Sequence, residues 1–232
     1  MRKSLIFIIN LVFLTGLLTP PFAAAAEVNP ESALRKLVTG NGRFVTGNVK
    51  NPRQDATYRK ASMAGQNPFA AILSCSDSRV PVEILFDQGL GDLFIVRVAG
   101  NTPDEYVWAS LEFAVNALQV PLIAVIGHEK CGAVAAAMGD KKFPGALGKL
   151  IKAIRKNLKE RTCDPKASLA CGIGNNVAAV VAKFSKFPSP FADRVRENKL
   201  KVVGGVYDLK TGWVLIDSID VSTTGGLPVD DD

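Results

Sequence analysis

Histidine and cysteine are scarce in this chain, whose 232 residues include one histidine and four cysteines. The cysteines form no Cys-x-x-Cys motif, which excludes a dithiol redox centre of the usual kind. There is no internal repeat, and beyond the first 26 residues no apolar run is long and charge-free enough to span a bilayer. Nearly half of the residues are apolar and 22% are charged, as expected for one well-packed globular domain.

Basic residues gather in only one segment, residues 149–161, although the net charge is +6. No aromatic residues lie among them, so this segment lacks the stacking platform of a nucleic-acid-binding surface. Apolar residues in and beside the segment recur at helical spacing, namely Leu147, Leu150, Ile151, Ile154 and Leu158. We expect a core-packed helix with a solvated basic face and no nucleic-acid partner. Contact with an anionic membrane or polymer is the alternative.

The first 26 residues have the three parts of a secretory signal peptide. Arg2 and Lys3 precede an apolar stretch from Leu5 to Leu18, and the small residues 23–26 offer a cleavage site after Ala26. This stretch is shorter than the roughly 20 residues of a membrane span, and no cysteine follows it to carry a lipid. We predict a signal peptide at 1–26, no stable membrane insertion, and export to the periplasm or an equivalent lumen. An uncleaved anchor is the alternative.

Short apolar runs alternate with helical patterns along residues 27–232. Strands are predicted at 69–74, 93–98, 121–126, 202–207 and 213–216, with a turn at 208–212 between the last two. A first helix is predicted to begin at Pro30, and Gly40 and Gly42 are expected to interrupt it. A second helix is predicted to follow Thr102 as its N-cap, and two more are predicted at 131–138 and 177–187. Residues 47–68 read as an irregular arm. The pattern predicts one α/β domain with a central, mostly parallel sheet flanked by helices and an antiparallel C-terminal addition.

Two motifs that each follow a predicted strand carry the chemistry of this chain. The first is Cys75-Ser76-Asp77-Ser78-Arg79, and the second is Gly127-His128-Glu129-Lys130-Cys131-Gly132. In open α/β sheets, ligands bind beyond the carboxyl ends of strands where two crossovers diverge, so the motifs can meet there. Two thiols and one imidazole are ligands that Zn²⁺ prefers, and they leave a fourth position for water. We therefore predict a catalytic zinc site made by Cys75, His128 and Cys131.

Asp77 and Arg79 complete the predicted site. Two thiolates neutralise Zn²⁺, so a ligating Asp77 carboxylate or a bound hydroxide leaves the site at a net charge of −1, which a bidentate Arg79 can compensate. The alternative is a closed structural knot in which Asp77 is the fourth ligand beside Cys75, His128 and Cys131. Structural sites more often use a fourth Cys or His from short-spaced pairs. Val80, Leu85 and Phe86 are candidate pocket walls, although core packing is their more usual role.

The other two cysteines, Cys163 and Cys171, lie eight residues apart in a stretch that reads as a loop. Export would place them in an oxidising compartment, where disulfides form and persist. We predict a disulfide between Cys163 and Cys171, with free thiols as the alternative.

At these motifs the chain resembles the β-class carbonic anhydrases. Cys75-x-Asp77-x-Arg79 and His128-x-x-Cys131 match the two signatures of that family in order and separation, and the match extends from about Leu34 to Ile216. Segments beside the signatures agree: Gly65-Gln66-Asn67-Pro68, Val96-Arg97-Val98-Ala99-Gly100-Asn101 and Ser110-Leu111-Glu112-Phe113.

The resemblance implies zinc-dependent, reversible hydration of CO₂ to bicarbonate and a proton, with one zinc per subunit and zinc-bound hydroxide as the nucleophile. Cys75, His128 and Cys131 would be the metal ligands. Asp77 and Arg79 would be the catalytic dyad that orients the nucleophile, or that closes the site when Asp77 binds the metal. Gln66 matches a position that often hydrogen-bonds substrate, and Phe113 replaces the tyrosine of many relatives. Family dimers build each site near a subunit interface, so a homodimer or higher oligomer is expected.

Two other functions remain open at this stage. Some relatives hydrolyse CS₂ or similar molecules with the same fold and metal. Alternatively, the chain is an inactive, zinc-stabilised scaffold that binds bicarbonate or a partner protein, although such a scaffold has little need of the Asp77–Arg79 pair. If the chain is an enzyme, its single histidine is committed to the metal, so protons must leave through water, buffer or an acidic group.

Overall fold

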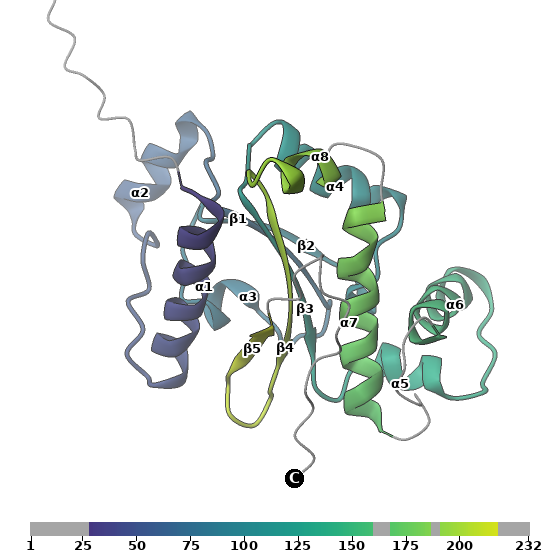
Figure 1. Ribbon diagram of the computed structural model, residues 1–232. Coiled ribbons are helices and arrows are strands. Elements are labelled where there is room, and N and C mark those ends of the chain that lie inside the picture. Colours follow the sequence, from purple (N-terminus) through teal and green to yellow (C-terminus); the bar gives the residue numbers. More distant parts are fainter. Residues whose placement is uncertain (1–27, 160–167, 187–190, 218–232) are drawn as a thin grey trace, which may run out of the picture.

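A computed structural model describes residues 28–159, 168–186 and 191–217 (Figure 1). Its centre is a sheet in which the strands follow the order β2-β1-β3-β4-β5. The bounds are β1 Ala70–Ser74, β2 Leu93–Arg97, β3 Leu122–His128, β4 Lys201–Tyr207 and β5 Val214–Asp217. β1 to β4 are parallel, and β5 pairs antiparallel with β4. The predicted α/β fold class is therefore confirmed, including its antiparallel C-terminal strand.

The central strands β1, β3 and β4 are buried almost throughout, as their nearly continuous aliphatic sequences predict, whereas the outer strands β2 and β5 are partly exposed. Successive side chains point to opposite faces: Ala71 and Leu73 of β1 belong to one core cluster, and Ala70 and Ile72 to another. Helices α1 and α7 lie on opposite sides of the sheet in Figure 1. The first cluster includes residues of α4 (Glu105–Asn116), α7 (Leu169–Lys186) and α8 (Phe191–Arg196), and the second includes residues of α1 (Pro30–Val45) and α3 (Val82–Leu85).

Helix α1 runs through both glycines that were expected to interrupt it, so that prediction was wrong. It starts at Asn29, whose side chain accepts a hydrogen bond from the Ser32 N–H, and it continues to Val45. A Cβ on Gly40 would lie 1.8 Å from the carbonyl oxygen of Phe86. Gly40 therefore allows the helix to approach the segment after α3 closely, and the packing outweighs the low helix propensity of glycine.

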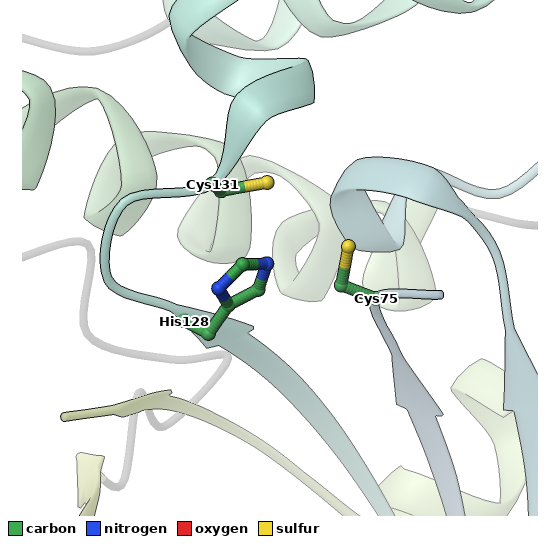
Figure 2. A group of neighbouring side chains, drawn as sticks. All are labelled: Cys75, His128 and Cys131. Atoms are coloured by element: carbon green, nitrogen blue, oxygen red, sulfur yellow. The ribbon is translucent and has the colours of Figure 1, made fainter. Parts of the chain in front are cut away.

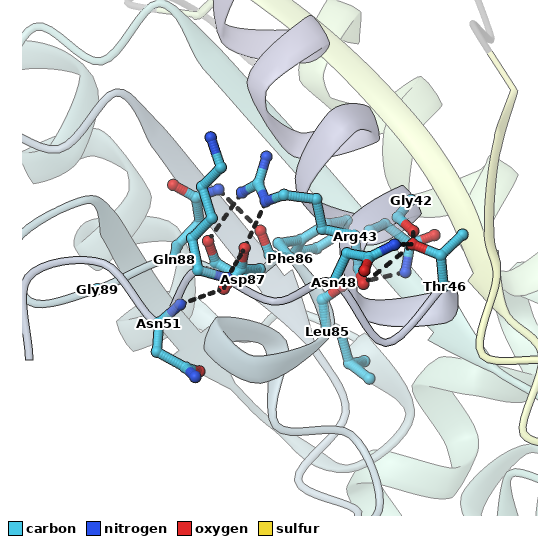
Figure 3. A network of polar contacts seen from close by, with 12 residues as sticks. Gly42, Arg43, Thr46, Asn48, Asn51, Leu85, Phe86, Asp87, Gln88 and Gly89 are labelled. Atoms are coloured by element: carbon cyan, nitrogen blue, oxygen red, sulfur yellow. Dashed lines mark hydrogen bonds and ion pairs between the residues drawn. The ribbon is translucent and has the colours of Figure 1, made fainter.

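The arm after α1 is more ordered than expected, because it contains α2 (Ala56–Ala61) and the short 3₁₀ helix η1 (Ser62–Ala64). Asp55 caps α2 through the N–H of Tyr58. The buried carboxylate of Asp87 fixes the start of the arm, since it accepts hydrogen bonds from the N–H groups of Lys50 and Asn51 and from the Arg43 side chain (Figure 3).

The cap of α4 also differs from the prediction. Asp104, two residues after Thr102, is the N-cap, and its carboxylate accepts from the Val107 N–H at 2.9 Å. Thr102 is instead buried, and its hydroxyl donates to the carbonyl oxygen of Gly100 at 2.9 Å. A capping pattern in sequence cannot distinguish these two roles, because both residues are good cap formers.

Two helices cover the carboxyl end of the sheet: α5 (Gly132–Met138) and α6 (Gly145–Lys159). As predicted, α6 buries Ile151, Ile154 and Leu158, while its lysines are exposed. Leu147, near the start of the helix, was expected on the same packed face but is 49% exposed. Arg155 instead turns inward and donates to three carbonyl oxygens at the end of α5, those of Ala137, Gly139 and Lys141. Within the described ranges, no helix is long and apolar enough to cross a membrane. The predicted signal peptide lies outside those ranges.

Candidate metal centre

The two sequence motifs meet at the carboxyl ends of two adjacent parallel strands. Cys75 directly follows β1, His128 is the last residue of β3, and Cys131 is the N-cap residue of α5 (Figure 2). β1 and β3 are neighbours, with Ser74 in register with Ile126. Because β2 lies on one side of β1 and β3 on the other, the chain after β1 and the chain after β3 diverge here. The site lies at the switch point that the sequence predicted.

The three ligand atoms form a compact and buried group. The two Sγ atoms and the His128 imidazole nitrogen all lie within 4.8 Å of one another. His128 is fully buried, and Cys75 and Cys131 are 4% and 2% exposed. The Nδ1 atom of His128 lies 2.8 Å from the carbonyl oxygen of Glu129. This contact assigns the proton of the ring to Nδ1 and leaves Nε2 unprotonated, with its lone pair available to a metal ion.

The Nε2 atom of His128 has no hydrogen-bond partner although it is buried. An unpaired polar atom of this kind costs free energy unless a ligand completes it. A Zn²⁺ ion would complete it, because the surrounding atoms are two sulfurs and one imidazole nitrogen, and the contact of Nδ1 with a carbonyl is the usual orientation of a zinc-bound histidine. The residues therefore fit one zinc ion per subunit.

A hydrogen bond links the sulfurs of Cys75 and Cys131. The hydrogen bond from Cys131 lowers the pKa of Cys75 to about 4 although burial opposes this, and the same bond raises the pKa of Cys131. The N–H groups of Gly100 and Asp77 also donate to the Cys75 sulfur, at 3.3 and 3.4 Å. These contacts favour the thiolate form of Cys75, which is the form that binds metal. Metal binding would release the proton that remains on Cys131.

Asp77 and Arg79 form a bidentate ion pair at the edge of the group. Nε and Nη2 of Arg79 lie 2.9 and 2.8 Å from the two carboxylate oxygens, and the Arg79 N–H also donates to Asp77. The Arg79 hydrogen bonds hold the pKa of Asp77 well below its usual range. Oδ2 of Asp77 lies 3.8 Å from Nε2 of His128. Asp77 therefore borders the compact group without belonging to it, and its role as a fourth ligand stays a prediction.

Other predicted site residues lie elsewhere in this chain. Gln66 is exposed and precedes β1, at the amino end of the strand whose carboxyl end bears Cys75. The structure does not bring it to the ligands, and its substrate role stays a prediction. The candidate wall residues Val80, Leu85 and Phe86 are buried in the core cluster that includes α1, in their expected packing role.

Of the predicted disulfide pair, only one cysteine lies within the described ranges. Cys171 is disulfide-bonded and belongs to α7. Cys163 lies outside those ranges, so the pairing itself stays a prediction.

Two residues at the end of β2 and just beyond it, Arg97 and Gly100, support the site and were not predicted to do so. Arg97, at the end of β2, donates to the carbonyl oxygens of Cys75 and Asp77 and so fixes the loop between them. Gly100 donates its N–H to the Cys75 sulfur. A charged residue at the end of an otherwise apolar strand was a signal for Arg97, whereas nothing in the local sequence indicated the contact of Gly100.

Solved structures share this architecture. A β-carbonic anhydrase from Coccomyxa in complex with acetazolamide superimposes with a TM-score of 0.63 and 27% identity, over 80% of this chain and 86% of that one. A tetrameric β-carbonic anhydrase from Sordaria macrospora gives 0.62 and 25% identity, over 84% and 98%. The fold and the site thus define a metalloenzyme built as the β-carbonic anhydrases are.

Sequence comparisons agree with the structural ones. The family model described as carbonic anhydrase matches residues 70–214. Carbonic anhydrase 2 of Mycobacterium tuberculosis is 39% identical over 194 residues, which cover 82% of this chain and 94% of the relative. A carbonic anhydrase of Mycolicibacterium smegmatis is 50% identical over 110 residues, 47% of this chain and 53% of the relative. The chain belongs to the carbonic anhydrase family, in its β class, and is an enzyme of that kind.

Proposed function

We propose that this protein catalyses the reversible hydration of CO₂ to bicarbonate and a proton, with zinc held by Cys75, His128 and Cys131. One observation carries the proposal: these three side chains converge within 4.8 Å at the switch point of the sheet, and the buried Nε2 of His128 has no hydrogen-bond partner. A zinc ion in such a site acts as a Lewis acid that makes water a nucleophile near neutral pH.

Asp77 and Arg79 would supply orientation and proton control. Arg79 binds both carboxylate oxygens and keeps Asp77 ionised, so the carboxylate can only accept hydrogen bonds. Its Oδ2 atom lies 3.8 Å from His128 Nε2. From there it would accept a hydrogen bond from the reacting water and direct a lone pair of that water at CO₂. If the pair opened, Asp77 could turn toward the ligands and close the site. The intact pair argues against an inactive scaffold.

Stopped-flow measurement of CO₂ hydration tests this function directly. The mature protein should accelerate hydration, Cys131→Ala should abolish the activity together with metal binding, and Asp77→Asn should lower the rate while the metal is retained. Retained metal without hydration in the unaltered protein would overturn the proposal. CS₂ hydrolysis by the same preparation would then identify the other substrate class.

We also propose a homo-oligomer, at least a dimer. Large apolar side chains stand exposed on one subunit, among them Met63 at 85%, Tyr106 at 75% and Phe113 at 51%. Such side chains are enriched in the buried centres of interfaces. A second subunit could also bring its Gln66 near a site that the residue does not reach within its own chain. Light scattering on the purified protein measures the mass, and a monomer at micromolar concentration would contradict this proposal.

Export to the periplasm or an equivalent lumen remains our proposal for the location. It is supported by the arrangement of Arg2, Lys3, the apolar stretch and the small residues before Glu27. The proposed disulfide between Cys163 and Cys171 suits such a compartment. N-terminal sequencing of the mature protein should begin at Glu27, and a sequence that begins at Met1 would contradict cleavage.

A further inference from the structure

A continuous chain of hydrogen bonds ends on the ligand Cys75. Lys183 Nζ donates to Oδ1 of Asn157 at 2.6 Å, and Asn157 Nδ2 donates to Oδ1 of Asn176 at 2.8 Å. Asn176 Nδ2 then donates to the Gly100 carbonyl oxygen at 2.7 Å, and the Gly100 N–H donates to the Cys75 sulfur at 3.3 Å. An ammonium group on α7 is thereby connected to a metal ligand through a residue of α6, a second residue of α7 and one backbone residue.

The direction of every bond in this chain is fixed by the chemistry of its ends. An ammonium group can only donate, so the Asn157 atom that faces Lys183 must be the oxygen. A carbonyl can only accept, so the Asn176 atom that faces Gly100 must be the nitrogen. The two amides therefore have one consistent orientation, and all donors point from Lys183 toward the sulfur.

The residues in the middle of this series of hydrogen bonds are buried. Asn157 and Asn176 are fully buried. Thr102 is 2% exposed, and its hydroxyl donates to the Gly100 carbonyl oxygen at 2.9 Å and lies 3.2 Å from Oδ1 of Asn176. In such surroundings, aligned hydrogen bonds polarise one another and each becomes stronger than it would be in water. The positive charge at one end thus favours the negative charge on sulfur at the other.

Gly100 has no freedom to turn away from this arrangement. Its φ of 67° is in the left-handed region, and a Cβ there would lie 2.7 Å from Cδ1 of Ile154 on α6. The residue is therefore pressed against α6, with its carbonyl held by Asn176 and its N–H aimed at Cys75.

We propose that Asn176 is a positioning residue for the metal ligand Cys75, and that Lys183, acting through Asn157, draws electron density from that sulfur. The inference rests on the proposed function only in requiring a metal ion on Cys75. A thiolate that donates less charge leaves the metal a stronger Lewis acid. This matters here because the two thiolates would neutralise the 2+ charge of the zinc ion.

Cobalt substitution of the mature protein tests the polarising role, because the thiolate-to-Co²⁺ charge-transfer band reports the electron density on sulfur. Lys183→Met removes the charge at a half-buried position and should move the band to longer wavelength. Lys183→Arg retains a donor and a charge and should leave the band near its original position. Asn175→Ala, which alters the neighbouring asparagine of α7 outside the chain of bonds, is the matched control and should not move it.

Zinc affinity, measured by competition with a chelator, tests the positioning role. Asn176→Leu should weaken zinc binding by about tenfold or more, as expected when a group that orients a metal ligand is lost. Should this buried variant fail to fold, the band of Lys183→Met still decides the inference. An unmoved band in Lys183→Met overturns it. A wild-type protein that binds cobalt without any thiolate band would instead overturn metal ligation by Cys75, and the proposed function with it.

Discussion

Arg79 holds both carboxylate oxygens of Asp77, through Nε at 2.9 Å and Nη2 at 2.8 Å. The pair is adjacent to the metal ligands in the sequence and in space, and it leaves Asp77 Oδ2 facing His128. The carboxylate is therefore held in position before any substrate arrives, which is how an enzyme lowers a barrier without reorganising during the reaction.

Substitution of Arg79 by lysine should separate charge from geometry. Lysine keeps the positive charge, but its ammonium group cannot form the planar bidentate pair with both carboxylate oxygens of Asp77. We expect kcat/KM for CO₂ hydration to fall about tenfold, the equivalent of about 1.4 kcal/mol of lost orientation. The exposed Arg35 of α1, changed to lysine, is the control. Equal activity in both variants would show that charge alone suffices at residue 79.

Turnover at saturating CO₂ should depend on the concentration of buffer. The only histidine belongs to the candidate metal site, so no imidazole of this chain would be free to carry protons away from it. We expect kcat to rise with added imidazole-type buffer and to reach a plateau, as seen by stopped flow at constant pH and ionic strength. A rate that is already maximal at the lowest buffer concentration would reveal an internal proton carrier.

Gly40 and Gly42 offer a matched pair for testing the packing of α1. Alanine at residue 40 would place its Cβ 1.8 Å from the Phe86 oxygen, whereas at residue 42 the nearest atom is a Trp213 carbon at 4.0 Å. Gly40→Ala should lower the free energy of unfolding by about 3 kcal/mol, and Gly42→Ala should raise it by about 0.5–1 kcal/mol. Urea unfolding measures both. Equal effects would mean that α1 does not pack against Phe86.

Because of Asp87, the free energy of unfolding should decrease as the pH is lowered into the acid range. Burial would raise the pKa of this carboxyl group, but the hydrogen bonds from the Lys50 N–H and from Arg43 outweigh burial and lower it. Because the pKa is lower in the folded state, the stabilisation is complete above the unfolded value near 4 and is lost as the pH falls through the folded value.

The variant Asp87→Asn isolates this contribution. It should be about 3 kcal/mol less stable than the unaltered protein at pH 7, and the difference should narrow below about pH 4. The exposed Asp140, changed to asparagine, is the control and should differ little at either pH. Urea unfolding at several pH values checks this, and a difference that stays constant to pH 2 would contradict it.

The sequence was most informative where local patterns decide the structure. The aliphatic runs predicted the strands, and the residues just after two of those runs supplied the candidate metal ligands, because parallel strands bring their carboxyl ends to one edge. Short helices were missed: α3 and α8 have four and six residues, too few for a helical period to show. Gly40 misled the prediction because its partner, the Phe86 carbonyl, is 46 residues away.

The hydrogen bonds between side chains of different helices could not be predicted. Asn157 and Asn176 look like ordinary polar residues of two helices, yet both are fully buried and connect Lys183 to the loop beside Cys75. The position of Gln66 could not be predicted either. The resemblance implied a hydrogen bond to substrate, but it did not show that Gln66 precedes β1, at the end of the strand opposite to Cys75. Only the folded arrangement shows which polar groups lie behind the site.

The central claim is that two sulfurs and one imidazole hold a zinc ion that keeps a position for an oxygen ligand. Zinc K-edge absorption on the purified protein counts these ligands directly. We predict two sulfurs at about 2.3 Å and two nitrogen or oxygen ligands at about 2.0–2.1 Å. A shell of four sulfurs, or protein purified without stoichiometric metal, would contradict the account.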